Sequence, residues 1–181
     1  MSYNEYYNSY NEMIIKKIKT AVDYLKILGI LLMTFLLLWF FVASFFASGG
    51  IFSYLLAALT VFLAYLLLIV QNVEYEYNFT MGDLDIAVIY SKKKRRRLID
   101  IKCNHMEDFS EYNESAKQKI KTIVNGKVIH AISNKKDVKL YSIIFHGVNG
   151  KKNALIFEPN EEMVTSIQKQ FSKIQAMGQN R

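Results

Sequence analysis

The sequence contains few cysteines, prolines and histidines, and it lacks the common motifs of nucleotide-binding and nucleophilic enzymes. Its 181 residues include one cysteine, Cys103, one proline and three histidines. A single cysteine excludes an internal disulfide and suits a reducing compartment. There is also no glycine-rich phosphate loop and no Ser–His–Asp arrangement. The common signatures of nucleotide binding and of nucleophilic catalysis are therefore missing.

Charge is absent from one long stretch, residues 27–73. This stretch holds two apolar runs, Ile27–Ala47 and Ile51–Val70, which Ser48, Gly49 and Gly50 separate. A helix of about 20 residues is roughly 30 Å long, the thickness of the hydrocarbon core of a bilayer. A helix in a soluble core would carry a polar stripe, and the apolar part of a signal peptide is shorter. We therefore predict a two-helix transmembrane hairpin over 27–70.

The charged residues lie on both sides of the hairpin, and lysine is prominent there. The arm over 1–26 carries Lys16, Lys17, Lys19 and Lys26, and residues 74–181 carry 19 Lys and Arg against 13 Asp and Glu. Basic flanks stay on the cytoplasmic side of a membrane. The sequence thus predicts a multi-pass protein of the cell membrane with both termini cytoplasmic. Because the spans hold no Asp, Glu, Lys, Arg or His, a transporter or pump is disfavoured.

The arm over 1–26 divides into two parts. Its first eleven residues are mostly Tyr, Asn and Ser, which is typical of a loose tail. Apolar residues then recur at helical spacing over 12–23, with lysines elsewhere around the helix. We expect a basic amphipathic helix that either lies on an anionic membrane surface or extends the first span.

After the hairpin, the periodicity changes from helical to alternating. Val73–Phe79 alternates apolar and polar residues, so it is predicted to be a strand. A second strand is predicted where Leu84, Ile86, Val88 and Tyr90 alternate with Asp83, Asp85, Ala87 and Ile89, and a third at Leu98, Ile99 and Ile101. Residues 104–115 are read as a short helix or a loop, and 116–124 as a basic helical turn or an exposed strand. Further strands are expected at Lys127–Ile132, Lys139–Phe145 and Ala154–Phe157, and Asn149-Gly150 predicts a hairpin.

The chain ends in a segment with an apolar stripe at helical spacing. Pro159 fits a first helical turn, and Ile167, Phe171 and Ile174 share one face, so we expect a helix from about Pro159 to Ala176 with Phe171 against the sheet. Residues 71–181 therefore form a cytoplasmic antiparallel β domain closed by a C-terminal helix. The fold class is an α+β membrane protein, and this order of elements is that of pleckstrin-homology-like (PH-like) domains.

One stretch also carries a resemblance to a known family. Residues 73–86 read VEYEYNFTMGDLDI, and the run Lys92–Arg97 follows shortly after. Together with the two spans, this segment resembles an uncharacterised family of small bacterial two-span membrane proteins, a domain of unknown function. It is also similar to the first strands of bacterial membrane-attached PH-like domains. The resemblance covers about 27–101 and implies an architecture without catalytic residues; PH-like domains generally bind lipids, peptides or partner proteins.

The most singular motif is a run of six cations, Lys92, Lys93, Lys94, Arg95, Arg96 and Arg97, between two predicted strands. Each cation near an anionic leaflet contributes about 1 kcal/mol of attraction. PH domains often meet lipid headgroups with such a turn, so we expect contact with anionic lipid. The run could also be a solvated turn or a topology signal. Nucleic acid is disfavoured, because no aromatic residue lies in the run to stack on a base.

Other polar groups support weaker hypotheses. Glu74, Glu76, Asp83 and Asp85 could converge across a hairpin to hold a cation, but are more typical of a solvent face. Plausible zinc ligands occur at Cys103, His105, Glu107 and Asp108, but their spacing matches no strong zinc pattern. His130 and His146 lie on separate predicted strands and could come near one another. We expect no cofactor and no metal. The favoured function is a non-enzymatic, membrane-anchored module that binds anionic lipid headgroups or a membrane protein partner; the alternative is a membrane-bound enzyme using the acidic strand residues with Cys103 and His105.

Overall fold

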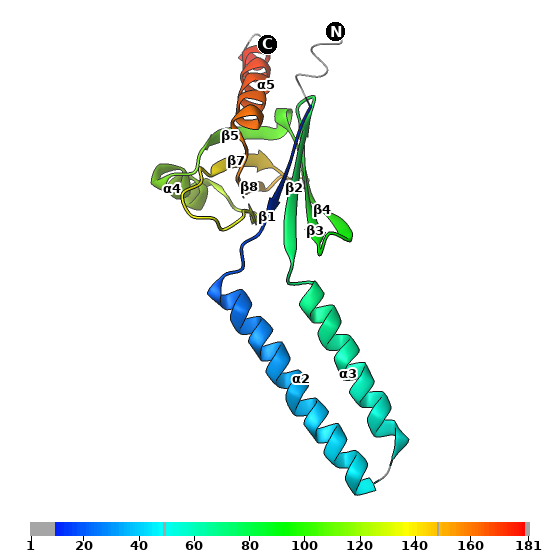
Figure 1. Cartoon of the computed structure of the whole chain (residues 1–181). Helices are drawn as coiled ribbons and strands as arrows, with labels where there is room; N and C mark the ends of the chain where they lie inside the picture. Colours follow the sequence, from blue (N-terminus) through cyan, green and yellow to red (C-terminus); the bar gives the residue numbers. More distant parts are fainter. Residues whose placement is uncertain (1–9, 49, 148, 180–181) are drawn as a thin grey trace. The chain divides into compact units, whose positions relative to one another are not determined.

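The computed structural model describes residues 10–48, 50–147 and 149–179, which form two compact units (Figure 1). The helical unit comprises Ile18–Val73 and Tyr90–Lys94. The strand-rich unit contains the described part of Met1–Lys17 together with Glu74–Ile89 and the described part of Arg95–Arg181. Most of the predicted tail and Gly49 of the predicted outer turn lie outside the described residues.

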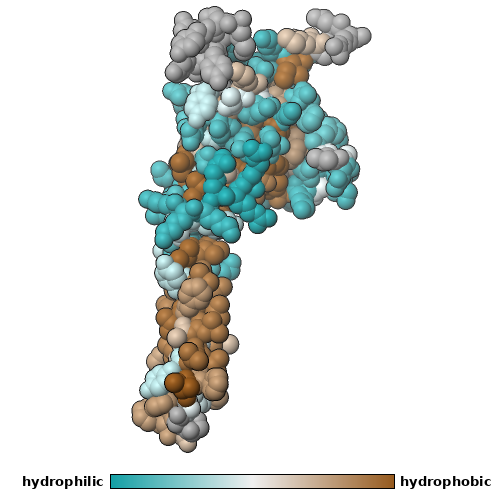
Figure 2. Space-filling view, turned by 90° about the vertical axis from the view of Figure 1, so that its right-hand side faces the viewer, coloured by the Kyte–Doolittle hydropathy of each residue, from teal (hydrophilic) through white to brown (hydrophobic). Residues whose placement is uncertain are grey.

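The helical unit is built from two apolar helices that pack along each other, α2 (Ala21–Ser48) and α3 (Ile51–Ile69). The Thr20 backbone N–H and hydroxyl both donate to the Asp23 carboxylate at 3.0 Å, which caps the start of α2. Figure 2 shows that hydrophobic side chains cover the visible face of this helix pair. Both helices are long and apolar enough to cross a membrane, and α2 starts at Ala21 rather than at Ile27.

The arm before α2 forms a strand, so the prediction of an amphipathic helix over 12–23 was wrong. β1 (Tyr10–Lys16) pairs antiparallel with β2 (Val73–Thr80) along its whole length. Ile15 is buried at 7% exposure, whereas Ile14 on the opposite face is 56% exposed. The local apolar pattern suits either structure, and pairing with the backbone of β2 decides for the strand.

The first sheet has the order β1-β2-β3-β4, with β3 at Asp83–Tyr90 and β4 at Lys94–Lys102. β2 and β3 lie where the alternation predicted them. β4 starts at Lys94 rather than at Leu98, which corrects the interpretation of the whole run 92–97 as a turn. Only the first part of the run belongs to the turn, and the rest lies on an edge strand.

The second sheet has the order β5-β7-β8-β6. Its strands are β5 (Met106–Glu111), β6 (Val128–Ala131), β7 (Tyr141–His146) and β8 (Lys152–Phe157). β7 and β8 are antiparallel, as the Asn149-Gly150 signal predicts. β6 and β8 are parallel, which corrects the expectation of an entirely antiparallel domain.

The segment that the sequence left open contains three elements. A short 3-10 helix, η1 (Cys103–His105), leads into β5, and the helix α4 (Glu114–Ile123) follows. Asn113 caps α4, because its side-chain oxygen accepts a hydrogen bond from Ala116 N at 2.9 Å. Half of the acidic stretch over 104–115 is therefore the strand β5, and the basic stretch that follows lies in the helix α4.

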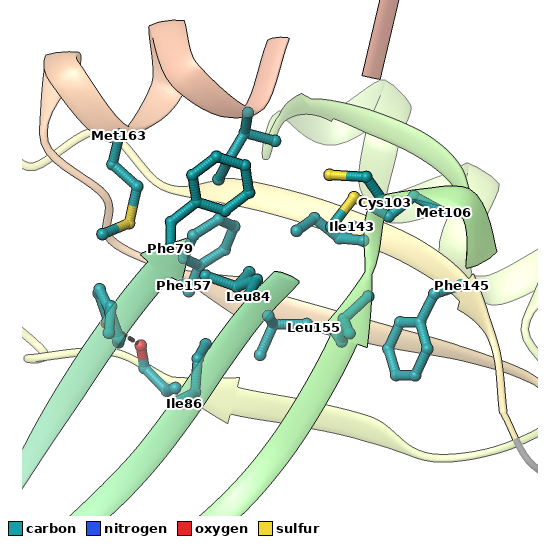
Figure 3. Packing of buried hydrophobic residues seen from close by; sticks show 14 of the residues in the cluster. Phe79, Leu84, Ile86, Cys103, Met106, Ile143, Phe145, Leu155, Phe157 and Met163 are labelled. Atoms are coloured by element: carbon teal, nitrogen blue, oxygen red, sulfur yellow. Dashed lines mark hydrogen bonds between the residues drawn. The ribbon is translucent and has the colours of Figure 1, made fainter. Parts of the chain in front are cut away.

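The two sheets and α5 (Glu161–Gln179) share one hydrophobic core. Figure 3 shows Phe79 and Leu84 of the first sheet near Phe157 of the second and Met163 of α5. Ile167 is fully buried, while Phe171 is partly exposed and packs against the same core. The C-terminal helix therefore covers the core, as the apolar stripe predicts.

One polar contact lies at the edge of this core and another lies inside it. Asn160 Oδ1 accepts a hydrogen bond from Met163 N at 2.8 Å, so Asn160 caps α5 and Pro159 precedes the helix instead of starting it. Deeper inside, the Tyr77 hydroxyl donates to the Ala131 carbonyl, which ties β2 of the first sheet to β6 of the second. Burial raises the pKa of Tyr77, so this hydroxyl stays protonated.

Candidate functional site

The turn between β3 and β4 is strained and is held by hydrogen bonds. Ser91 and Lys92 have φ values of 48° and 58°, a left-handed conformation that L residues with side chains rarely adopt. Ser91 Oγ donates to the carbonyl of Ile69, the last residue of α3, at 2.6 Å. Ser91 N also donates to Asn72 O at 2.8 Å. Ser91 thus fixes the turn to the C-terminal end of α3.

Three exposed lysines lie at this turn, and we call Lys92, Lys93 and Lys94 the lysine cluster. In the part of the chain that the structure describes, no acidic side chain forms an ion pair with them. The C-terminal end of a helix carries partial negative charge, which favours cations nearby by about 0.3–1 kcal/mol. That attraction is small for three adjacent positive charges, so the cluster retains a strong local field.

The arginines of the same run behave differently. Arg95 forms a bidentate pair with Glu76, at 2.8 and 2.9 Å, and a longer contact of 3.4 Å with Asp85. Arg97 Nε lies 3.0 Å from Asp85 Oδ1. These pairs cross β2, β3 and β4 on one face of the first sheet. The run therefore separates into a lysine cluster without acidic partners and two arginines, Arg95 and Arg97, that pair with the strands beside them. The sequence did not indicate this division.

The same contacts bear on the hypothesis that Glu74, Glu76, Asp83 and Asp85 converge to hold a cation. Glu76 and Asp85 do converge across neighbouring strands, but arginine side chains occupy the space between them. No group of three or more potential metal ligands occurs among the described residues. Of the four acidic strand residues, Glu76 and Asp85 are thus part of the sheet's ion-pair network.

Cys103 and His105, which the enzyme alternative combines with the acidic strand residues, lie in different surroundings. Cys103 is 2% exposed and belongs to the hydrophobic core, near Met106 in Figure 3. Burial, together with the negative charge of Asp83, raises the pKa of the Cys103 thiol to about 12. A nucleophilic cysteine needs the thiolate, and this environment disfavours it. His105 is exposed at the end of η1.

The two strand histidines are not brought together. His130 on β6 lies opposite Ile156, and His146 on β7 lies opposite Lys152, so they occupy different levels on either side of β8. His146 Nε2 instead lies 3.4 Å from Glu107 Oε2. The register of the sheet therefore keeps His130 and His146 apart, and the hypothesis that they come near one another was wrong.

Sequence reasoning missed a cleft within the strand-rich unit. It has a volume of about 560 Å³ and lies between β1, β7 and the start of α5, with Met13, Tyr141 and Val164 among its walls. Glu158 also lines it, and the carboxylate of Glu158 accepts hydrogen bonds from Ser133 N and Oγ. No local motif marks this cleft, because its walls come from distant parts of the sequence.

Comparison with known proteins gives one match. The model of a family described as Bacterial PH-like domain (DUF6106) matches residues 7–176, a range that includes both apolar helices. No curated protein and no solved structure matches the chain. The match confirms the resemblance over about 27–101 and extends it to nearly the whole sequence. The chain therefore belongs to the bacterial PH-like domain family DUF6106.

Proposed function

We propose that this protein is a non-enzymatic module, anchored in the cell membrane by α2 and α3, that contacts anionic lipid headgroups through the lysine cluster. The observation that carries the proposal is the pair of hydrogen bonds from Ser91 to Ile69 and Asn72. If α3 spans a bilayer, its C-terminal end lies at the membrane surface, and Ser91 holds the three lysines at that level.

The pairing of β1 with β2 supports a hairpin topology. β1 ends at Lys16, shortly before α2, and β2 begins at Val73, shortly after α3. Because these strands pair along seven residues, the segments before and after the hairpin lie on the same side of any membrane that it spans. The basic flanks favour the cytoplasmic side for both termini.

Electrostatics sets the size of the expected effect. Each lysine near an anionic leaflet contributes about 1 kcal/mol, so the cluster contributes at most about 3 kcal/mol. The attraction is screened over a Debye length of about 8 Å at physiological ionic strength. A local strain of about 1–2 kcal/mol at a left-handed residue is typical of positions whose conformation serves a function.

The test uses the full chain reconstituted in vesicles that contain mainly phosphatidylcholine. Electron spin resonance measures the relative association of spin-labelled phosphatidylglycerol and phosphatidylcholine with the protein. We expect the parent to prefer phosphatidylglycerol at about 50 mM salt and to lose this preference at about 500 mM, where screening is strong. Replacing Lys92, Lys93 and Lys94 with Ser should remove most of the preference.

The matched control replaces Lys135, Lys136 and Lys139 with Ser. These lysines are also exposed, and they lie in the loop between β6 and β7 of the strand-rich unit. The control removes the same charge and should keep the preference. If the lysine-cluster variant selects phosphatidylglycerol as well as the parent does, the cluster is not the lipid contact, and a protein partner becomes the better explanation.

A further inference from the structure

A groove runs between α2 and α3 within the helical unit. Its volume is about 560 Å³, and Ile30, Met33, Leu63 and Leu67 provide much of its apolar wall. Ala64 of α3 lies in the wall opposite α2. A side-chain carbon added at Gly29 would meet no atom within 4 Å, so the groove is open beside this glycine.

The polar groups inside the groove are already satisfied. Thr34 Oγ1 donates to Ile30 O at 2.7 Å, and Thr60 Oγ1 donates to Leu56 O at 2.8 Å. A hydroxyl that bonds to its own helix presents mainly its methyl group to a neighbour. The groove therefore presents hydrocarbon along its length, and the hydroxyls of its two threonines do not need a polar ligand.

The two ends of the groove differ in charge. Lys26 and Gln71 line one end, and the opposite end reaches Leu37 and Thr60, where no charged side chain lines it. Gln71 directly precedes Asn72, whose carbonyl accepts the hydrogen bond from Ser91. The lysine cluster is thus fixed at the same end of α3 as the charged end of the groove.

We infer that this groove binds one anionic phospholipid, with an acyl chain along the apolar walls and the phosphate headgroup at Lys26 and the lysine cluster. The inference rests on the proposed function and adds a defined site to a general attraction. A groove with hydrocarbon along its length and cations at one end is complementary to the two parts of such a lipid. Basic pockets between membrane helices are known to take anionic headgroups in this way.

The experiment uses the full chain in a neutral detergent, incubated with equal amounts of phosphatidylglycerol and phosphatidylcholine and examined by native mass spectrometry. We expect the parent to retain a single phosphatidylglycerol. Gly29→Leu fills the open space and should abolish that adduct. The control Ala58→Leu adds bulk at an exposed position of α3 that does not line the groove and should leave it unchanged.

A second variant tests the headgroup end without altering the groove walls. Lys26→Ala should weaken retention by about fivefold, the effect of one cation near an anionic headgroup, whereas Lys173→Ala on α5 should have no effect. Circular dichroism checks that each variant keeps its helices.

Two results would overturn the inference. One is a Gly29→Leu protein that retains phosphatidylglycerol as the parent does. The other is a parent dimer that Gly29→Leu dissociates, which would place a second copy of the chain in the groove. After either result, the proposed function still stands if the lysine-cluster variant loses its lipid preference in vesicles. If the parent itself shows no salt-sensitive preference for phosphatidylglycerol, both the proposed function and the groove inference are wrong.

Discussion

Replacing Ile167 with Ala should loosen α5 and expose the thiol of Cys103. Ile167 is fully buried on α5, and α5 packs against η1, which carries Cys103. Truncating an isoleucine in a closed core destabilises a protein by about 2–5 kcal/mol. Because a buried thiol reacts only when its surroundings open, 2 kcal/mol increases the open population, and hence the labelling rate, by about 30-fold.

The assay follows the reaction of the full chain in neutral detergent with an aromatic disulfide reagent at about pH 8, where an exposed thiol reacts readily. Since Cys103 is the only cysteine, the absorbance change reports a single site. Gln168→Ala removes an exposed side chain from the same helix and should label as slowly as the parent. If Ile167→Ala labels within about twofold of the parent, α5 does not close the core around Cys103, and the reasoning from burial is refuted.

Four further outcomes are expected. Burial raises the pKa of Cys103 from its ordinary value of 9.0 to about 12. The stability that the neutral thiol contributes is therefore present below about pH 9 and is lost as pH rises toward 12. Denaturant titrations should therefore give a falling free energy of unfolding over that window, and Cys103→Ala should remove this part of the fall. Tyr77→Phe should destabilise the fold by about 1–3 kcal/mol, since it leaves the Ala131 carbonyl without its donor; an unchanged denaturation midpoint would contradict this. Lys92→Gly should raise the thermal midpoint by relieving the left-handed strain while weakening the lipid preference, and a lower midpoint would count against the strain. In a Cys103→Ala background, an impermeant thiol reagent should label Ser48→Cys but not Lys173→Cys in intact cells; labelling of Lys173→Cys alone would reverse the topology.

A residue that reports the membrane topology by thiol labelling has to be exposed. Cys103 is cytoplasmic in the proposed topology. Because it is buried, it would fail to label whichever side of the membrane it is on, so its lack of labelling does not distinguish the two topologies. An exposed residue such as Lys173 gives an informative answer, since it reacts wherever the reagent can reach it.

The sequence alone determined the features that depend on local composition. The two apolar helices follow from an uncharged stretch that no polar face interrupts, whereas the start of α2 at Ala21 lies before that stretch. β2 follows from strict alternation, β3 from alternation that passes into an apolar run, and α5 from an apolar stripe at helical spacing. Each of these patterns is complete within a single element, so neighbours in the fold are not needed to interpret it.

Tertiary structure alone decided the features that depend on distant partners. The segment Tyr10–Lys16 became a strand because β2 offers it a backbone partner more than fifty residues away in sequence. The run over 92–97 divided because Glu76 and Asp85 pair with arginines, whereas the bonds from Ser91 to Ile69 and Asn72 place the lysines beside α3. Hydrogen bonds and ion pairs act over a few ångströms whatever the sequence separation, so only the folded chain reveals which residues they join.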